Sequence, residues 1–212
     1  MKQGGILMTI KAIIFDMDGV LIDARDWHYE SLNKALSLFG FDINMSDHLN
    51  YFDGLPTRKK LIKLTNEYGF PEKLHEFINE LKQKYTQEIA FVNCKPVFAH
   101  EYMLASLADM DFKLACCSNS VRESVDMMLS KAQLYDYFNY TLSNEDVEKP
   151  KPSPDMYQKA VKYLKMEPSE CLIVEDNENG IKAAIASGCH VLRVKDPDDV
   201  HLDRVLTKVK EI

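Results

Sequence analysis

The feature that most constrains this chain is a short apolar run at residues 12–15, Ala-Ile-Ile-Phe, which stops at two acids and a glycine. A run this short, without polar alternation, is typical of a strand buried on both faces of a parallel sheet. Asp16, Asp18 and Gly19 follow, so the strand is expected to open into a turn at its carboxyl end. Ligands of open α/β sheets bind at that end, which makes these acids candidates for a functional site.

Asp16 and Asp18 are separated by a single residue, and two carboxylates this close repel each other and are costly to bury. A cation between them would offset that cost, and Mg²⁺ suits oxygen ligands. The alternative is that both acids are ordinary turn residues, since Asp and Gly are common in turns. Further polar residues at the same sheet edge would favour the metal site.

Residues 24–93 carry apolar side chains at helical spacing and contain no convincing strand. Gly40 and Gly69 are expected to end the first two of three helices, and Thr57 is expected to cap the start of the second. The segment is too long for a simple crossover between strands. We therefore predict that residues 24–93 form a helical cap inserted after the first strand.

From about residue 98 the pattern alternates between strands and helices. Strands are expected at residues 112–117, 140–142, 171–174 and 190–194. This alternation is typical of a parallel sheet with helices on its faces. We predict an α/β fold in which a Rossmann-like parallel sheet forms the core, built from residues 1–23 and 94–212.

Polar residues follow three of these later strands: Ser118 and Asn119, the loop from Lys149 to Asp155, and Glu175 with Asp176. Ser118 is either the N-cap of the next helix or a hydroxyl that holds a phosphate at a helix N-terminus. Lys151 is either a solvated loop charge or an ammonium group that adjacent prolines aim inward at phosphate oxygens or a nucleophile. Glu175 and Asp176 either cap a helix or complete a Mg²⁺ site.

The composition limits the classes of function. With 46% apolar and 28% charged residues, the 212-residue chain has the composition of a globular protein. Its net charge of −7 argues against a general binder of nucleic acid or of a membrane surface. No apolar run approaches the roughly 20 residues of a membrane span, and residues 1–7 are too short and too weakly apolar for a signal peptide. Met8 is an alternative start.

The five cysteines have no zinc-ligand spacing, and several lie in apolar runs. They favour a reduced protein, and hence a cytoplasmic location.

Four motifs, in order along residues 10–195, resemble those of the haloacid dehalogenase superfamily, in its Mg²⁺-dependent phosphatase branch with a small helical cap. They are Phe15–Leu21, Ser118–Asn119, Lys151–Asp155 and Val174–Ile181. The first is highly specific, and the second is weak alone. Lys149 begins an overlapping match to the third motif but leaves Ser153 where the family has an acid, so Lys151 is the expected lysine.

The resemblance implies a covalent mechanism. Asp16 would attack phosphorus and form an aspartyl-phosphate, while Asp18 would protonate the leaving oxygen and later deprotonate the hydrolytic water. An acid at residue 18 also argues against the dehalogenase branch, where this general acid is absent.

The same resemblance implies a set of ligands. Mg²⁺ would be bound by the Asp16 carboxylate, the Asp18 backbone carbonyl and the Asp176 carboxylate, with Glu175 as a direct or water-mediated ligand. The residues implied to balance the charge of the transferring phosphoryl group are Ser118, Asn119 and Lys151.

Two further features resemble the beta-phosphoglucomutase-like subfamily. His28 matches a histidine that lies near the cap hinge in that subfamily, although it could equally be a plain surface or core histidine. Gly54–Arg58 matches a substrate-contacting cap loop, in which Arg58 is expected to bind a second anionic or hydroxylated group. The lysines at residues 59, 60 and 63 are expected on a solvated helix face. Relatives carry Pro-Gly at the position of Val97–His100. Because this chain departs from them there, the resemblance does not specify the geometry of the hinge and of the entrance, and hence does not specify the substrate.

These observations predict a cytosolic phosphatase, monomeric or weakly dimeric, that hydrolyses a small phosphorylated metabolite. The favoured substrate class is a sugar phosphate. A phosphosugar mutase would use the same residues. A catalytically idle binding protein on the same fold is a third alternative, because fold does not fix function.

Overall fold

The computed structural model describes residues 10–212, so the expectations about residues 1–7 and Met8 lie outside the described residues. Its centre is a parallel five-stranded sheet in the order β3-β2-β1-β4-β5. The strands are β1 (Ala12–Phe15), β2 (Lys113–Cys117), β3 (Tyr140–Leu142), β4 (Cys171–Glu175) and β5 (His190–Arg193). Each lies within one residue of its predicted bounds, and the predicted Rossmann-like α/β fold is confirmed.

Strand β1 lies at the centre of the sheet, where Phe15 is in register with Cys116 of β2 and Val174 of β4. Its four residues are fully buried, and successive side chains point to opposite faces of the sheet. Ile13 and Phe15 belong to one hydrophobic cluster, and Ala12 and Ile14 belong to another. A continuous apolar run is therefore what this position requires.

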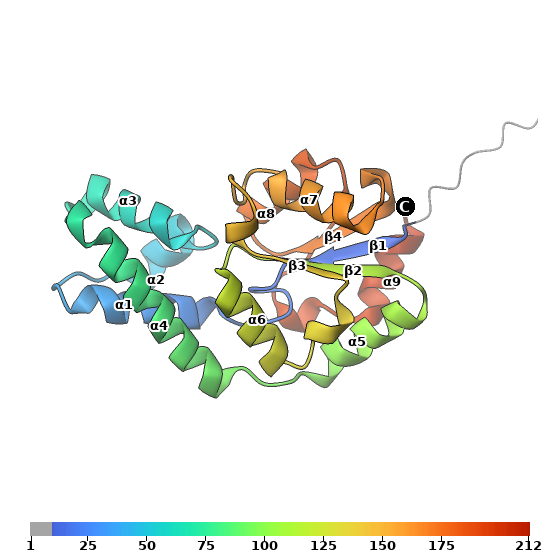
Figure 1. Cartoon of the computed structure of the whole chain (residues 1–212), viewed down its shortest axis with the longest axis horizontal. Coiled ribbons are helices and arrows are strands. Elements are labelled where there is room, and N and C mark those ends of the chain that lie inside the picture. Colours follow the sequence, from blue (N-terminus) through green and yellow to red (C-terminus); the bar gives the residue numbers. More distant parts are fainter. Residues whose placement is uncertain (1–9) are drawn as a thin grey trace, which may run out of the picture.

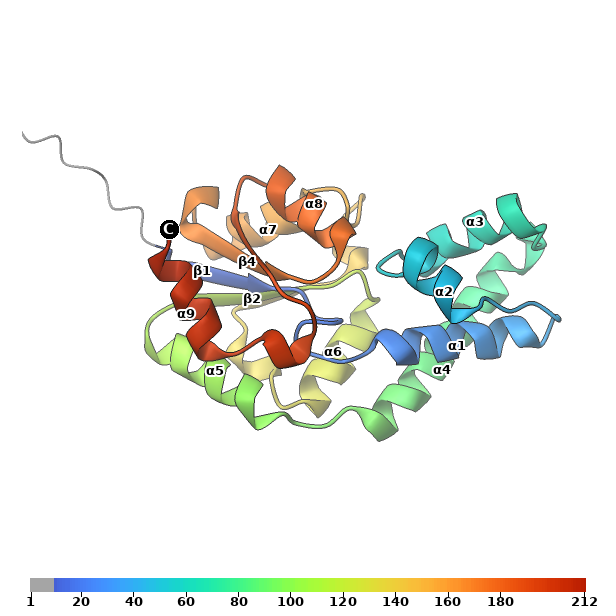
Figure 2. The same ribbon diagram turned by 180° about the vertical axis from the view of Figure 1, so that it is seen from behind.

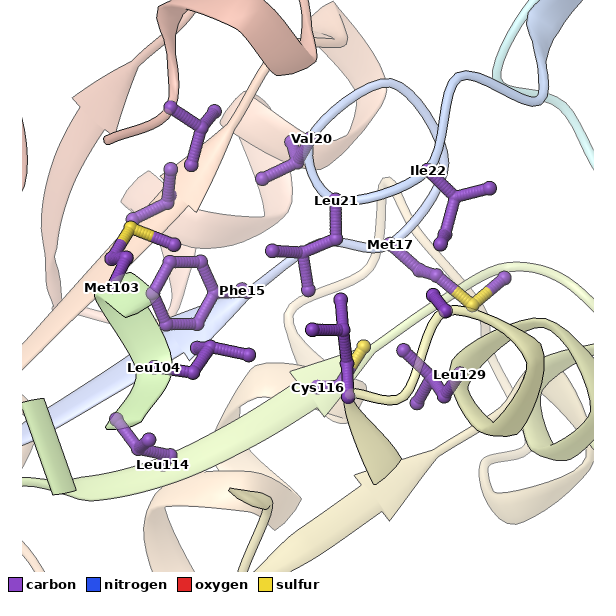
Figure 3. Close-up of a cluster of buried hydrophobic side chains, with 14 of the residues drawn as sticks. Phe15, Met17, Val20, Leu21, Ile22, Met103, Leu104, Leu114, Cys116 and Leu129 are labelled. Atoms are coloured by element: carbon purple, nitrogen blue, oxygen red, sulfur yellow. The ribbon is translucent and has the colours of Figure 1, made fainter. Parts of the chain in front are cut away.

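Helices cover both faces of the sheet (Figure 1). One face carries α5 (Phe98–Asp109), α6 (Arg122–Lys131) and α9 (Leu202–Lys210), and Figure 3 shows Phe15 beside Met103 and Leu104 of α5. The other face carries α7 (Asp155–Leu164) and α8 (Glu178–Ala186). Short 3-10 turns lie at Glu72–Leu74, Tyr135–Tyr137, Asn144–Asp146, Pro168–Glu170 and Pro197–Asp199.

Between β1 and α5 the chain forms helices only: α1 (Arg25–Ser37), α2 (Met45–Asp47), a π-helical turn (His48–Phe52), α3 (Thr57–Tyr68) and α4 (His75–Asn93), with one of the 3-10 turns before α4. They enclose a separate hydrophobic cluster that includes Leu32, Leu61 and Ile78. Figures 1 and 2 show them beyond the carboxyl end of β1. The last turn of α4 does not pack into this separate cluster, since Ala90 belongs to the hydrophobic cluster of the α/β core. The boundaries of the cap, residues 24–93, stay a prediction.

One local expectation is wrong in this segment. Thr57 does not cap α3; it is the first residue of that helix, Pro56 occupies the N-cap position, and no side chain bonds there. Gly40 ends α1 as predicted: its φ is +73°, its backbone N–H donates to the Ser37 carbonyl oxygen, and the Phe41 N–H donates to the Leu36 carbonyl oxygen. Gly69 likewise ends α3. In residues 10–212, no helix combines the length and apolar character that crossing a membrane requires.

Candidate active site

The carboxyl ends of the strands face the helical segment across a cavity of about 480 Å³. Eight of the predicted site residues line it: Asp16, Asp18, His28, Arg58, Asn119, Lys151, Glu175 and Asp176. Ser118 is fully buried, and its hydroxyl donates to Asp18. Residues 97–100, where the chain departs from Pro-Gly, do not line the cavity.

Asp16 stands at the end of β1 with 7% of its surface exposed. Burial and the neighbouring Glu175 carboxylate raise its pKa well above the usual value, and Lys151 opposes that shift. The Nζ of Lys151 lies 2.5 Å from Asp16 Oδ1. The carboxylate is thus fixed in direction by one buried cation.

Lys151 is only 2% exposed, so it is not a solvated loop charge, whereas Lys149 is exposed. Its Nζ also lies 2.9 Å from the carbonyl oxygen of Cys117 and 2.9 Å from Glu175 Oε2. Burial alone would lower the pKa of Lys151, but the two carboxylates raise it above its usual range. The ammonium group therefore stays charged between its two acids.

Glu175 is held entirely by donors of the protein. The Tyr157 hydroxyl donates to Oε2 at 2.5 Å, and the backbone N–H groups of Asp176 and Asn177 donate to Oε1 at 3.2 and 3.1 Å. A Cβ at residue 180 would lie 1.9 Å from Oε2, so Gly180 gives this carboxylate its space. Glu175 therefore orients Lys151. Neither acid of the pair caps α8, because Asn177 does so.

The carboxylates of Asp16, Glu175 and Asp176 each place an oxygen within 4.8 Å of the others. Asp176 Oδ1 is buried and has no hydrogen-bond partner among the described residues. Burial and Glu175 raise the pKa of Asp176 to about 7, which reflects negative charge that the protein does not balance. These donors fit an oxygen-binding cation such as Mg²⁺. Asp176 and Asp16 are the residues best placed to hold it, because every Glu175 oxygen already accepts protein hydrogen bonds.

Asp18 is held from two sides. Its Oδ1 lies 3.0 Å from His28 Nε2, and its Oδ2 accepts hydrogen bonds from the hydroxyls of Ser118 and Ser120, each at 2.9 Å. Burial opposes ionisation, but His28 and the two hydroxyls lower the pKa of Asp18 to about 2. Ser118 is not a helix N-cap, since Val121 holds that position of α6.

His28 is neither a surface residue nor an apolar core residue, because it links Asp18 to a lysine that the sequence did not suggest. Lys82 Nζ lies 3.2 Å from His28 Nδ1. Burial and the Lys82 charge lower the pKa of His28. A neutral ring that accepts from Lys82 at Nδ1 and donates to Asp18 from Nε2 satisfies both contacts.

The Asn119 side chain fastens the Lys151 loop. Its Oδ1 accepts from the Lys151 backbone N–H at 3.0 Å, and its Nδ2 lies 3.2 Å from the carbonyl oxygens of Lys151 and Gly54. Gly54 has φ +68°, and a Cβ there would lie 2.4 Å from Asn177 Oδ1. The cap loop thus rests directly on the strand-end loops, and a substrate contact of Asn119 stays a prediction.

Two cationic residues of α3 lie differently from what the sequence predicts: Arg58 is more exposed than expected, and Lys60 is more buried. The Arg58 side chain is 74% exposed, and its guanidinium group lies 3.5 Å from Glu76, at the rim of the cavity. Lys60 does not lie on a solvated face; it is 5% exposed and lines the cavity. The spacing carried a signal for both buried lysines, because Lys60 precedes Leu64 by four residues and Lys82 follows Ile78 by four.

Comparisons with known proteins agree with the geometry. A family model described as haloacid dehalogenase-like hydrolase matches residues 13–194, a span that contains all of these site residues. The phosphoglycolate phosphatase of Aquifex aeolicus (strain VF5) is 30% identical over 179 residues, or 84% of this chain and 82% of that protein. The pyrophosphatase PpaX of Anoxybacillus flavithermus (strain DSM 21510 / WK1) is 30% identical over 85% of this chain and 81% of that protein. The crystal structure of beta-phosphoglucomutase from Clostridium difficile has a TM-score of 0.82 at 22% identity, covering 95% of this chain and 98% of that chain.

Proposed function

The chain belongs to the haloacid dehalogenase-like hydrolases, in the phosphatase branch, and from that premise we propose that it is a Mg²⁺-dependent phosphatase of a small phosphorylated metabolite. Hydrolysis would proceed through an aspartyl-phosphate on Asp16. The observation that carries the proposal is the buried Lys151 ammonium group, 2.5 Å from Asp16 Oδ1, beside the acidic cluster at the strand ends.

In the first half of the proposed reaction, an Asp16 oxygen forms a bond to phosphorus as the bond from phosphorus to the leaving oxygen breaks. Lys151 keeps Asp16 in place and offsets negative charge beside the transferring group. Mg²⁺ held by Asp16 and Asp176 would add positive charge at the phosphoryl oxygens. Asp18 is ionised in the free site, so it would first take up a proton as the negative charge of the substrate raises its pKa, and it would then give that proton to the leaving oxygen.

In the second half, water attacks the phosphorus of the aspartyl-phosphate and transfers a proton to Asp18, which restores the enzyme. Asp18 suits both transfers in position, because His28 and the hydroxyls of Ser118 and Ser120 fix its two oxygens. His28 and Ser118 act through Asp18 and are therefore positioning residues.

The substrate is proposed only as a class. The names of the relatives refer to phosphoglycolate and to pyrophosphate, two dissimilar molecules, so neither transfers to this chain. A sugar phosphate remains our proposal for the metabolite. We also propose that the protein is cytoplasmic and that it is a monomer or a weak dimer. Because its net charge is −7, we propose no nucleic-acid partner.

A phosphosugar mutase is the second candidate, because the cap loop that rests on Asn119 could shield an aspartyl-phosphate from water while a sugar intermediate turns. A mutase would return the phosphoryl group to a sugar hydroxyl, whereas a phosphatase releases inorganic phosphate.

The deciding experiment incubates the purified protein with hexose and pentose phosphates and measures inorganic phosphate with Mg²⁺, with EDTA and with Ca²⁺. We expect stoichiometric phosphate release with Mg²⁺ only, because Ca²⁺ prefers longer bonds and more ligands. Mg²⁺ should also raise the Tm of the wild type but not that of Asp176→Asn. Full activity after exhaustive chelation would rule out the metal site, and isomerisation of a sugar 1-phosphate with little free phosphate would favour the mutase.

A further inference from the structure

Two of the five cysteines are neighbours across a pair of parallel strands. Strands β4 and β5 pair with Leu172 opposite His190, so Cys171 and Cys189, one residue earlier on each segment, are neighbours at the amino end of the pair. Both side chains belong to the hydrophobic cluster under α7 and α8, so they point to the same face of the sheet. Their sulfhydryl groups are hydrogen-bonded to each other.

The spacing of the two strands suits a disulfide bond. Neighbouring strands of a sheet lie about 4.7–4.9 Å apart, and a disulfide joins residues whose Cα atoms are roughly 4.4–6.8 Å apart. The backbone at Cys171 and Cys189 therefore needs little movement for the two sulfur atoms to bond.

The other three cysteines have different surroundings. Cys116 and Cys117 are adjacent on β2 and belong to the clusters on opposite faces of the sheet. Cys94 donates to the carbonyl oxygen of Met128 at 3.4 Å. The fold thus brings together one particular pair of thiols, at the end of the sheet opposite to the reacting residues.

The two thiols of this pair differ in reactivity. Hydrogen bonds with Cys171 and with the Ser187 hydroxyl lower the pKa of Cys189, against the effect of burial, whereas contact with Cys189 and burial raise the pKa of Cys171. The thiolate is the form of cysteine that oxidants attack, so Cys189 reacts first. Cys189 keeps 9% of its surface exposed and directly precedes β5, an edge strand, and such margins of a fold open locally at a low free energy.

We propose that Cys171 and Cys189 form an oxidisable dithiol, which a hydroperoxide converts into a disulfide bond between the β4 and β5 segments. The Cys189 thiolate attacks one oxygen of the hydroperoxide; an S–O bond forms, the O–O bond breaks, and the other oxygen takes a proton and leaves as an alcohol or as water. The Cys171 sulfur then attacks the sulfenic acid, so that the S–S bond forms, the S–O bond breaks and water leaves. The thiols lose two electrons and two protons, which the peroxide accepts.

The bond closes a loop that contains the acids of the candidate active site. Glu175 and Asp176 stand at the carboxyl end of β4, and α8 follows them before the chain returns to Cys189. The disulfide ties the strand that carries these acids to its neighbour without touching either of them. The inference is independent of the proposed function, and its test needs no substrate.

The test treats the folded wild type with a modest excess of hydrogen peroxide, removes the oxidant with catalase and titrates thiols with DTNB in guanidinium chloride. We expect the count to fall from five thiols to three, because the bond consumes two, and the intact mass to fall by two hydrogen atoms. Dithiothreitol should reverse both changes. Peptide mapping without reduction should recover the peptide of Cys171 linked to that of Cys189.

Cys94→Ser is the matched control, since Cys94 is also buried but donates to a carbonyl oxygen. It should lose two thiols as the wild type does, with the same peptides linked. Cys171→Ser and Cys189→Ser should form no disulfide within the chain. In Cys171→Ser, dimedone, a reagent for sulfenic acids, should label Cys189.

If one of the serine variants does not fold, the peptide map of the oxidised wild type still decides. A wild type that keeps all five thiols in the folded state overturns the proposal. So does a map that links other cysteines, or one that shows bonds only between separate molecules.

Discussion

The two walls of the cavity pair their charges in opposite ways. At the strand ends, Lys151 lies between Asp16 and Glu175, and Asp18 is bound by His28 and two hydroxyls. On the helical side, Lys60 and Lys82 are as deeply buried but have no carboxylate beside them among residues 10–212.

The two walls therefore differ in how far the protein itself balances its buried charges. The strand-end groups keep one another in place without a ligand, as a preorganised reaction centre requires. Among residues 10–212, the lysines of the helical wall have no carboxylate within 4.0 Å, so their charge is balanced less well than that of Lys151. The following predictions test this contrast, beginning with the largest expected effect.

Asp16→Asn should reduce phosphate release by roughly 10⁴-fold or more, since it removes the nucleophile's charge and leaves its volume nearly unchanged. The measurement is single-turnover and steady-state hydrolysis of the best substrate, with circular dichroism as the check that the fold persists. Appreciable hydrolysis by a clean preparation would exclude the aspartyl-phosphate.

Lys151→Met should lower the free energy of unfolding by about 3–5 kcal/mol, because it leaves two buried acids without their cation. Urea denaturation measures the effect, and Lys149→Met, at an exposed position of the same loop, is the control. The double variant Lys151→Met with Glu175→Gln should recover part of the loss. Additive losses would mean that the two groups do not stabilise each other.

Whereas Lys151→Met should destabilise the protein, Lys60→Met should stabilise it. We expect it to raise the free energy of unfolding at pH 7 by about 1–3 kcal/mol. The pKa of Lys60 is about 8 in the folded protein against an ordinary value of 10.5, so between these values the unfolded chain binds more protons and wild-type stability rises with pH. The advantage of the variant should therefore shrink as the pH rises from 8 to 10.5. The charged or titratable groups facing Lys60 are Asp18, Asp53, His28, His48 and Lys82.

Urea denaturation of both proteins at several pH values measures this difference, with Lys63→Met as the control. A destabilised Lys60→Met, or a difference that does not change with pH, would mean that Lys60 is already compensated within the fold.

The strands and the reacting residues could be predicted because their signals are local. The Ala12–Phe15 run followed by Asp16 and Asp18 specifies a buried strand and the acids at its end within a few residues. The choice of Lys151 over Lys149 followed from the residue spacing of the motif, and the structure buries Lys151 and exposes Lys149. The roles of these residues in a reaction remain predictions.

The partners of the polar side chains could not be predicted in the same way. Glu175 was expected as a direct or water-mediated metal ligand, and that role stays a prediction. What the sequence did not indicate is that Lys151, Tyr157 and two backbone N–H groups all bond to its oxygens. Tyr157 reaches it from α7, and no spacing in the sequence relates residues on different elements. Helical spacing placed Lys60 on the face of α3 that carries Leu64, but it could not show that Lys60 is buried against the cavity while Arg58 is exposed.

The sequence alone determined the sheet, the acids at the end of β1 and the lysine of the third motif, because each depends on residues that are neighbours along the chain. Only the tertiary structure decided that Asn119 fastens the Lys151 loop, that Glu175 orients Lys151, and that Lys60 and Lys82 face the cavity with no carboxylate within 4.0 Å among residues 10–212. Helical spacing shows which residues share a face. What that face meets is decided by how the inserted helices pack over the ends of the strands.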